Sequence, residues 1–135
     1  MNVEIPKGNS REDIKARRQI IKEQYVDWVS KHPEKKIWNA SLMADIHIKN
    51  RSFNEILGHA PKSYESTFAF TQMSDILNNA TLVKSMQPKN NDNNQKIFSK
   101  MNLLRWKCYR LLVGEQTSTG ELVLYYIGGG PKRKK

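Results

Sequence analysis

The chain has 135 residues, 38% of them hydrophobic, and a formal net charge of +10. This length is that of one domain, and the apolar content is too high for a disordered protein. No apolar run approaches the roughly 20 residues that a membrane helix needs. Cys108 is the single cysteine, which excludes an internal disulfide, and the N-terminus lacks the apolar stretch of a signal peptide. We therefore expect a cytoplasmic protein with no membrane partner.

Positive charge is concentrated in the last third of the chain. Residues 96–135 hold nine basic and two acidic residues, whereas residues 40–83 hold three basic and four acidic residues. Such asymmetry favours a polyanion partner, because a phosphate backbone attracts a basic surface whatever its sequence. Four of the basic residues follow three glycines at the C-terminus, so residues 128–135 are predicted to form a flexible basic tail.

Helical signals dominate the first half of the chain. Ser10 is a suitable N-cap, and apolar residues from Ile14 to Trp28 recur at helical spacing. Ser52 begins a second helix, and Gly58 is a natural stop that leaves His59 just outside it. The elements expected here are a helix over 11–30, strands over 35–39 and 45–49 with a helical turn between them, a helix over 52–57 and a helix from residue 63 or 66 to residue 79.

Strand signals dominate the second half. We expect strands over 81–86, 97–105, 106–115 and 121–127, with a loop over 87–95 and a turn over 117–120. Residues 101–127 are predicted to form the antiparallel centre of the fold. The fold class is therefore α+β, with N-terminal helices packed on one face of a C-terminal antiparallel β-sheet, and residues 1–127 form a single domain.

Several kinds of site are not indicated. The chain has no glycine-rich phosphate loop, and its three histidines and one cysteine lack metal-ligand spacing, so we expect no cofactor and no metal. Cys108 is interpreted as a small buried residue of a strand. Metal-free RNA cleavage stays open, because RNA carries its own nucleophile, the 2′-hydroxyl. The protein then supplies a base, an acid and cations that hold the phosphorane.

The segment from Ile46 to Ala80 resembles the barnase/EndoU/colicin/RelE-like (BECR) nuclease domains of phages and mobile elements. The matching pieces are a strand at 46–48, Ser52, His59, Lys62 and the stretch at 76–80. The resemblance covers residues 45–127, as a nuclease-like core, and leaves residues 1–44 as a helical extension. It implies a small metal-independent endoribonuclease, RNA rather than DNA as substrate, and a cognate immunity or partner protein.

The resemblance and the cation pattern together name the candidate residues. His59 is predicted to be the acid–base residue, because a histidine can take up or release a proton near neutral pH. The alternative is a histidine at a helix terminus, stabilised by the negative end of the helix. The predicted catalytic set is His59, Lys62, Arg110 and Tyr125, although Tyr125 also fits a packing role. The predicted nucleic-acid-binding residues are Arg51, Lys100, Arg105, Trp106, Lys107, Lys132 and Arg133. Among these, Trp106 is flanked by two cations and could stack on a base.

Two other readings remain. The domain could be a non-enzymatic nucleic-acid-binding or protein-interaction module of a mobile element, or a scaffold whose charge keeps it soluble. The position of His59 distinguishes them. A groove that holds His59 and two or more strand cations favours the enzyme, whereas His59 alone on an outer face favours the module.

Overall fold

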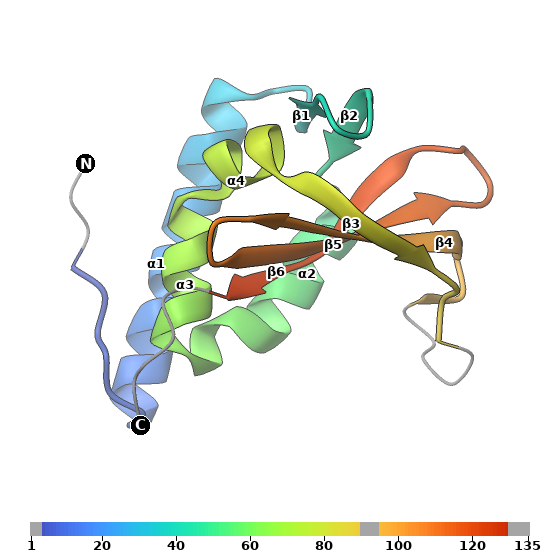
Figure 1. The fold of residues 1–135 in the computed structure, drawn as a ribbon. Helices are drawn as coiled ribbons and strands as arrows, with labels where there is room; N and C mark the ends of the chain where they lie inside the picture. The colour runs from blue at the N-terminus through green and yellow to red at the C-terminus, as the bar shows by residue number, and fades with distance from the viewer. Residues whose placement is uncertain (1–3, 90–94, 130–135) are drawn as a thin grey trace.

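The fold is described from a computed structural model, which describes residues 4–89 and 95–129 (Figure 1). Helices and a sheet pack against each other, which confirms the α+β fold class. In chain order the elements are α1 (Arg11–Lys31), β1 (Lys36–Asn39), β2 (Ala44–His47), α2 (Asn50–His59), the 3₁₀ helix η1 (Ala60–Lys62), α3 (Tyr64–Thr71), α4 (Met73–Asn79), β3 (Thr81–Met86), β4 (Phe98–Trp106), β5 (Tyr109–Gln116) and β6 (Leu122–Gly129).

The sheet has six strands in the order β1-β2-β6-β5-β4-β3. Strands β3 to β6 form an antiparallel meander, so the predicted antiparallel centre between residues 101 and 127 is confirmed. The two N-terminal strands join this meander at β6. That junction is parallel and short, since only Ile46 and His47 of β2 pair with β6. The sheet is therefore mixed. Beyond Val123, no strand of the described residues pairs with this edge of β6, and α2 contacts β6.

The main core lies between the sheet and the helices. Helices α2 and α3 pack on β6, α4 packs on β1, and α1 lies outside them against α3 (Figure 1). Leu104, Leu111 and Leu124 of the sheet are at most 1% exposed and meet Ile21 and Ile56 of the helices. Each such side chain contributes about 1.5–3 kcal/mol of hydrophobic stabilisation. The segment expected as an extension thus contributes directly to this core through Ile21.

The opposite side of the meander, here called the outer face, has a different composition. Residues directly opposite each other on neighbouring strands share a face, and the register therefore identifies its members. They include Lys84 of β3, Arg105 of β4, Arg110 and Leu112 of β5, and Tyr126 of β6. At the end nearer the β5–β6 turn, a small second cluster packs around Phe98, Met101, Val123 and Tyr125.

The helices predicted over 52–57 and up to residue 79 differ from the observed ones, since α2 covers Asn50–His59. Gly58 does not end α2, because its φ is not left-handed and Ala60 N–H still bonds to the carbonyl of Ile56. His59 is thus the last residue of α2, and Pro61 turns the chain into η1. The helix predicted up to residue 79 is divided into α3 and α4 at Gln72, whose ψ of 16° departs from helical geometry.

Two predictions at the end of the sheet also need correction. Gly128 and Gly129, assigned to a flexible tail, belong to β6 and pair with Arg110 and Tyr109. Gly129 has a φ of 86°, and a Cβ there would overlap the carbonyl oxygen of Cys108, so glycine is what lets the strands approach. Cys108 itself is exposed in the β4–β5 turn rather than buried in a strand. The rest of the predicted tail, residues 130–135, lies outside the described residues.

Candidate active site at the outer face of the sheet

A cavity of about 720 Å³ lies where α2 and α3 meet the outer face. It brings together three of the four predicted catalytic residues, His59, Arg110 and Tyr125, from one helix and two strands. The complete lining is Glu55, His59, Ser66, Met86, Gln87, Lys89, Gln95, Met101, Arg110, Leu112, Tyr125 and Tyr126. Arg110 is the one strand cation in this lining, whereas the criterion set out above for an enzyme asks for two or more; Lys89, three residues beyond the end of β3, is the second cation of the lining.

Glu55 and His59 form a hydrogen-bonded pair on α2. Residues four apart on a helix lie on the same side, and here Nε2 of His59 is 3.1 Å from Oε1 of Glu55. The Glu55 side chain is 17% exposed and that of His59 56% exposed, so the pair lies at the cavity rim. An ionised carboxylate only accepts hydrogen bonds. With Glu55 ionised, Nε2–H is the donor, and the lone pair of a neutral imidazole then lies on Nδ1.

Arg110 is an exposed cation on the outer face. It lies opposite Gly128 on β6 and opposite Arg105 on β4. Among the described residues, neither arginine has an acidic partner within ion-pair distance. The guanidinium of Arg110 is thus available to an anion in the cavity, which is the role expected of a phosphate-binding residue.

A β-bulge in β6 brings two consecutive tyrosines to the cavity. Leu112 pairs with Tyr126 and Val113 pairs with Leu124, so Tyr125 is the extra residue. Tyr125 is 8% exposed and its ring contacts Phe98 edge-on, with centroids 6.1 Å apart. Tyr126 is half-buried and leans along the strand, where a Cβ on Gly128 would overlap the end of its ring. Its phenol thus lies beside the strand position opposite Arg110.

Three other predicted residues lie away from this cavity. Lys62 is exposed in η1, three residues after His59, and does not line it. Arg51 lies at the first turn of α2, eight residues and therefore about 12 Å from His59. Lys100 pairs with Glu115 at 3.8 Å and lines a different cavity. The predicted set is thus brought together only in part.

The end of β4 and the turn after it carry three more of the predicted nucleic-acid-binding residues, Arg105, Trp106 and Lys107. Lys107 Nζ lies 4.4 Å from the centroid of the Trp106 ring, and Tyr109 stacks on that ring with centroids 6.2 Å apart. Trp106 packs against the core on the helix side of the sheet, whereas Arg105 points to the outer face. The side chains of Trp106 and Arg105 therefore lie on opposite faces of the sheet. Lys132 and Arg133 lie outside the described residues.

A buried arginine holds the turn that follows His59. Arg17 of α1 is fully buried, and its guanidinium donates to the carbonyl oxygens of Pro61, Pro6 and Gly8 at 2.7, 2.9 and 2.6 Å. The bond to Pro61 connects α1 to η1 two residues beyond His59. Arg17 thereby limits where the C-terminal end of α2 can lie.

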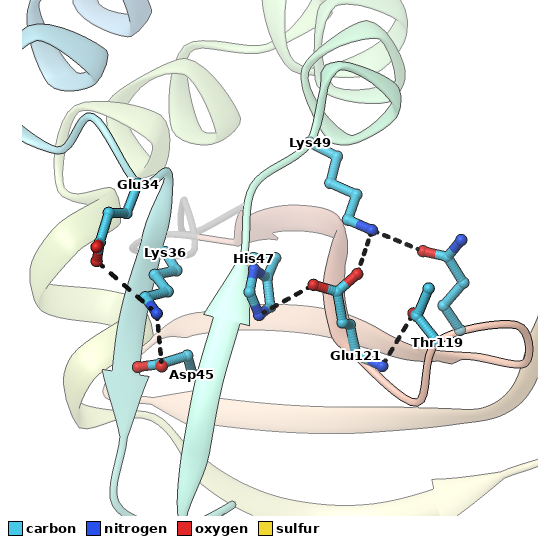
Figure 2. Close-up of polar contacts among 8 residues, drawn as sticks. Glu34, Lys36, Asp45, His47, Lys49, Thr119 and Glu121 are labelled. Atoms are coloured by element: carbon cyan, nitrogen blue, oxygen red, sulfur yellow. Dashed lines mark hydrogen bonds and ion pairs between the residues drawn. The ribbon is translucent and has the colours of Figure 1, made fainter.

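The opposite end of α2 is held by a polar network around Glu121 (Figure 2). Its carboxylate accepts from Lys49, the N-cap residue of α2, at 2.5 Å and lies 3.6 Å from Nε2 of His47. Lys49 also donates to Gln116, and Glu121 N–H donates to Thr119. The hydrogen bond from Lys49 holds the pKa of Glu121 below its ordinary value. The network thus joins β2, α2 and the β5–β6 turn, next to the short parallel pairing of β2 with β6.

A second cavity, of about 470 Å³, adjoins this network. Several of its polar groups are already paired with one another. Ser85 donates to Asn102 at 2.7 Å, Lys100 pairs with Glu115, and His47 lies against Glu121. We therefore interpret this cavity as structural and the one at His59 as the candidate site. Among residues 4–89 and 95–129, no group of three His, Cys, Asp or Glu side chains is arranged to hold a metal ion.

Comparison with known proteins gives the chain a family. The family called large polyvalent protein-associated domain 3 matches residues 13–103, more than half of the chain, and the chain belongs to this family. The expected association with phages and mobile elements is thereby supported, whereas the resemblance to BECR nucleases stays a prediction. Searches of curated proteins and of solved structures gave no match. The matched range includes Glu55 and His59 and ends before β5.

No helix of residues 4–89 and 95–129 combines the length and the apolar character that crossing a membrane requires.

Proposed function

We propose that this domain cleaves single-stranded RNA without a metal ion, at the cavity between α2 and the outer face. The observation that carries the proposal is the composition of that cavity. A histidine–carboxylate pair, two tyrosines and an arginine that has no acidic partner among the described residues converge there. A base, an acid and a cation are what cleavage of RNA by its own 2′-hydroxyl needs.

The proposed reaction starts at the 2′-hydroxyl next to the scissile phosphate. Nδ1 of His59 takes the hydroxyl proton. Nε2–H keeps its hydrogen bond to Glu55, whose negative charge stabilises the imidazolium. The 2′-oxygen forms a bond to phosphorus and the bond from phosphorus to the 5′-oxygen breaks. The phenol of Tyr126 protonates the leaving oxygen. Proton exchange with water then restores His59 and Tyr126, and the products are a 2′,3′-cyclic phosphate and a 5′-hydroxyl.

Arg110 has the electrostatic role in this proposal. The phosphorane carries more charge on its non-bridging oxygens than the starting phosphodiester, so a guanidinium that contacts these oxygens stabilises it more than the substrate. Tyr125 is more buried and packs on Phe98. We propose that Tyr125 fixes the wall of the cavity and that Tyr126 contacts the substrate.

The first test incubates the purified protein with mixed-sequence RNA in the presence of a metal chelator. We expect RNA ends with 2′,3′-cyclic phosphate, and we expect His59→Ala and Glu55→Gln each to slow cleavage by about a hundredfold or more. His47→Ala is the matched control, because His47 also faces a glutamate but lines the second cavity. It should cleave at the wild-type rate.

Absence of cyclic phosphate ends, or equal cleavage by His59→Ala, would leave the second candidate function. That function is a non-enzymatic nucleic-acid-binding module, and the exposed arginines of the outer face favour it independently of His59. Filter binding to an RNA that cannot be cleaved distinguishes it from a protein without affinity for nucleic acid.

A further inference from the structure

The outer face continues beyond the cavity as a row of cations. Arg110 on β5 lies directly opposite Arg105 on β4, and Lys84 of β3 lies diagonally across from Arg105, opposite Leu103. All three cations are exposed, and among the described residues none has an ion-pair partner. We call Arg110, Arg105 and Lys84 the cation row.

Like charges directly opposite each other destabilise an antiparallel pair. Arg105 and Arg110 form such a pair, and no carboxylate of the described residues separates them. An anion that lies over both guanidinium groups would remove the repulsion. This arrangement points to a ligand that carries negative charge over β4 as well as over the cavity.

A row of apolar side chains lies beside Arg105 and Arg110 and ends at Lys84. Leu103 pairs with Leu112, and Leu112 pairs with Tyr126, so these three half-buried side chains cross β4, β5 and β6 on the outer face. Neighbouring strands lie about 4.8 Å apart, so the two rows extend over roughly 10 Å or more. Cations beside apolar and aromatic side chains form a surface that suits a nucleic acid strand with accessible bases. A duplex hides its bases in the stack and fits such a surface poorly.

We infer that the outer face is an extended binding site for single-stranded RNA, in which Arg105 and Lys84 hold phosphates beyond the scissile one. This inference rests on the proposed function and deepens it, since it assigns Arg110 to the scissile phosphate. The bases then lie along Leu103, Leu112 and Tyr126. A dinucleotide fills only the cavity and does not reach Lys84.

The test measures binding of 2′-O-methyl RNA, which cannot be cleaved, as a dinucleotide and as an octanucleotide. The double variant Lys84→Met/Arg105→Met should bind the octanucleotide at least tenfold more weakly at low salt and the dinucleotide as the wild type does. The slope of log affinity against log salt should fall by about 0.7 for each lost phosphate contact. Arg18→Met/Lys22→Met is the control, because it removes equal charge from exposed positions of α1.

Three results would overturn the inference: wild-type binding of the octanucleotide by the outer-face variant, equal losses for the dinucleotide, or an equal loss in the control. A poly-glutamate peptide of the same charge that binds as tightly as the octanucleotide would also overturn it, in favour of an acidic protein partner. The cleavage assay with wild-type protein is scored separately. A protein that binds in the expected way but cuts no RNA contradicts the proposed function and leaves the binding site intact.

Discussion

At the scale of single residues, the bulge in β6 is decisive for the candidate site. It brings Tyr125 and Tyr126 to the same cavity and gives them different surroundings. Tyr125 is buried against Phe98, whereas the half-buried Tyr126 extends over Gly128 towards Arg110. The proposed reaction therefore assigns the general acid to Tyr126.

Removing the Tyr126 hydroxyl tests this assignment. Tyr126→Phe should slow cleavage of ordinary RNA by about a hundredfold, since the leaving oxygen loses its proton donor. A substrate whose 5′-oxygen is replaced by sulfur needs no protonation, and there Tyr126→Phe should cut at nearly the wild-type rate. Tyr125→Phe provides the comparison. An equal defect of Tyr126→Phe on both substrates would show that the phenol does not donate the proton.

At the scale of elements, α2 is the piece that must be positioned, and it is held at both ends. Lys49 binds Glu121 at its N-terminal end, and Arg17 binds Pro61 just beyond its C-terminal end. The two contacts come from different parts of the chain, and neither Lys49 nor Arg17 lines the cavity. Each contact can therefore be removed without replacing a residue of the cavity lining.

Arg17→Met should lower the free energy of unfolding. The carbonyl oxygens of Pro6, Gly8 and Pro61 lose their donor. The bond to Pro61 is buried, and leaving a buried polar group unpaired costs about 1–3 kcal/mol. The neighbouring Arg18→Met, at an exposed position, should change stability by less than about 0.5 kcal/mol. Urea unfolding measures both. Equal stability of the two variants would show that Arg17 does not fasten η1.

Lys49→Met should have a pH-dependent effect on stability. The pKa of Glu121 is lower in the folded protein than its ordinary value, mainly through the hydrogen bond from Lys49. Its stabilising contribution is thus present above the ordinary glutamate pKa and is lost as the pH falls through the lowered value. The stability difference from wild type should therefore be present at pH 7 and shrink in the acid range. A difference of constant size across that range would contradict this account.

Much of the local structure could be predicted from sequence because its signals are local. The N-cap at Ser10 and the apolar spacing of α1 are of this kind. The i,i+4 spacing of Glu55 and His59 was a readable signal for their pairing that the sequence analysis missed. The bulge, the pairing of Arg110 with Gly128 and the parallel junction of β2 could not be predicted, since they depend on register between distant segments.

At the scale of the whole molecule, the two faces of the sheet differ in burial and in charge. The helix-covered face buries the core, and the outer face combines exposed cations with the cavity at His59. The family match covers the helices and the first strands of the meander, whereas Arg110 and Tyr126 lie beyond it. The candidate site thus depends on how the final hairpin is placed against α2.

The most direct measurement uses a DNA oligonucleotide that contains a single ribonucleotide, incubated with the protein and a metal chelator. The proposed reaction uses the 2′-hydroxyl as nucleophile, so cleavage should occur only at the ribonucleotide and leave a 2′,3′-cyclic phosphate. His59→Ala should lose this cleavage and His47→Ala should keep it. Cleavage at deoxyribonucleotides, no cleavage at all, or full cleavage by His59→Ala would contradict the central claim.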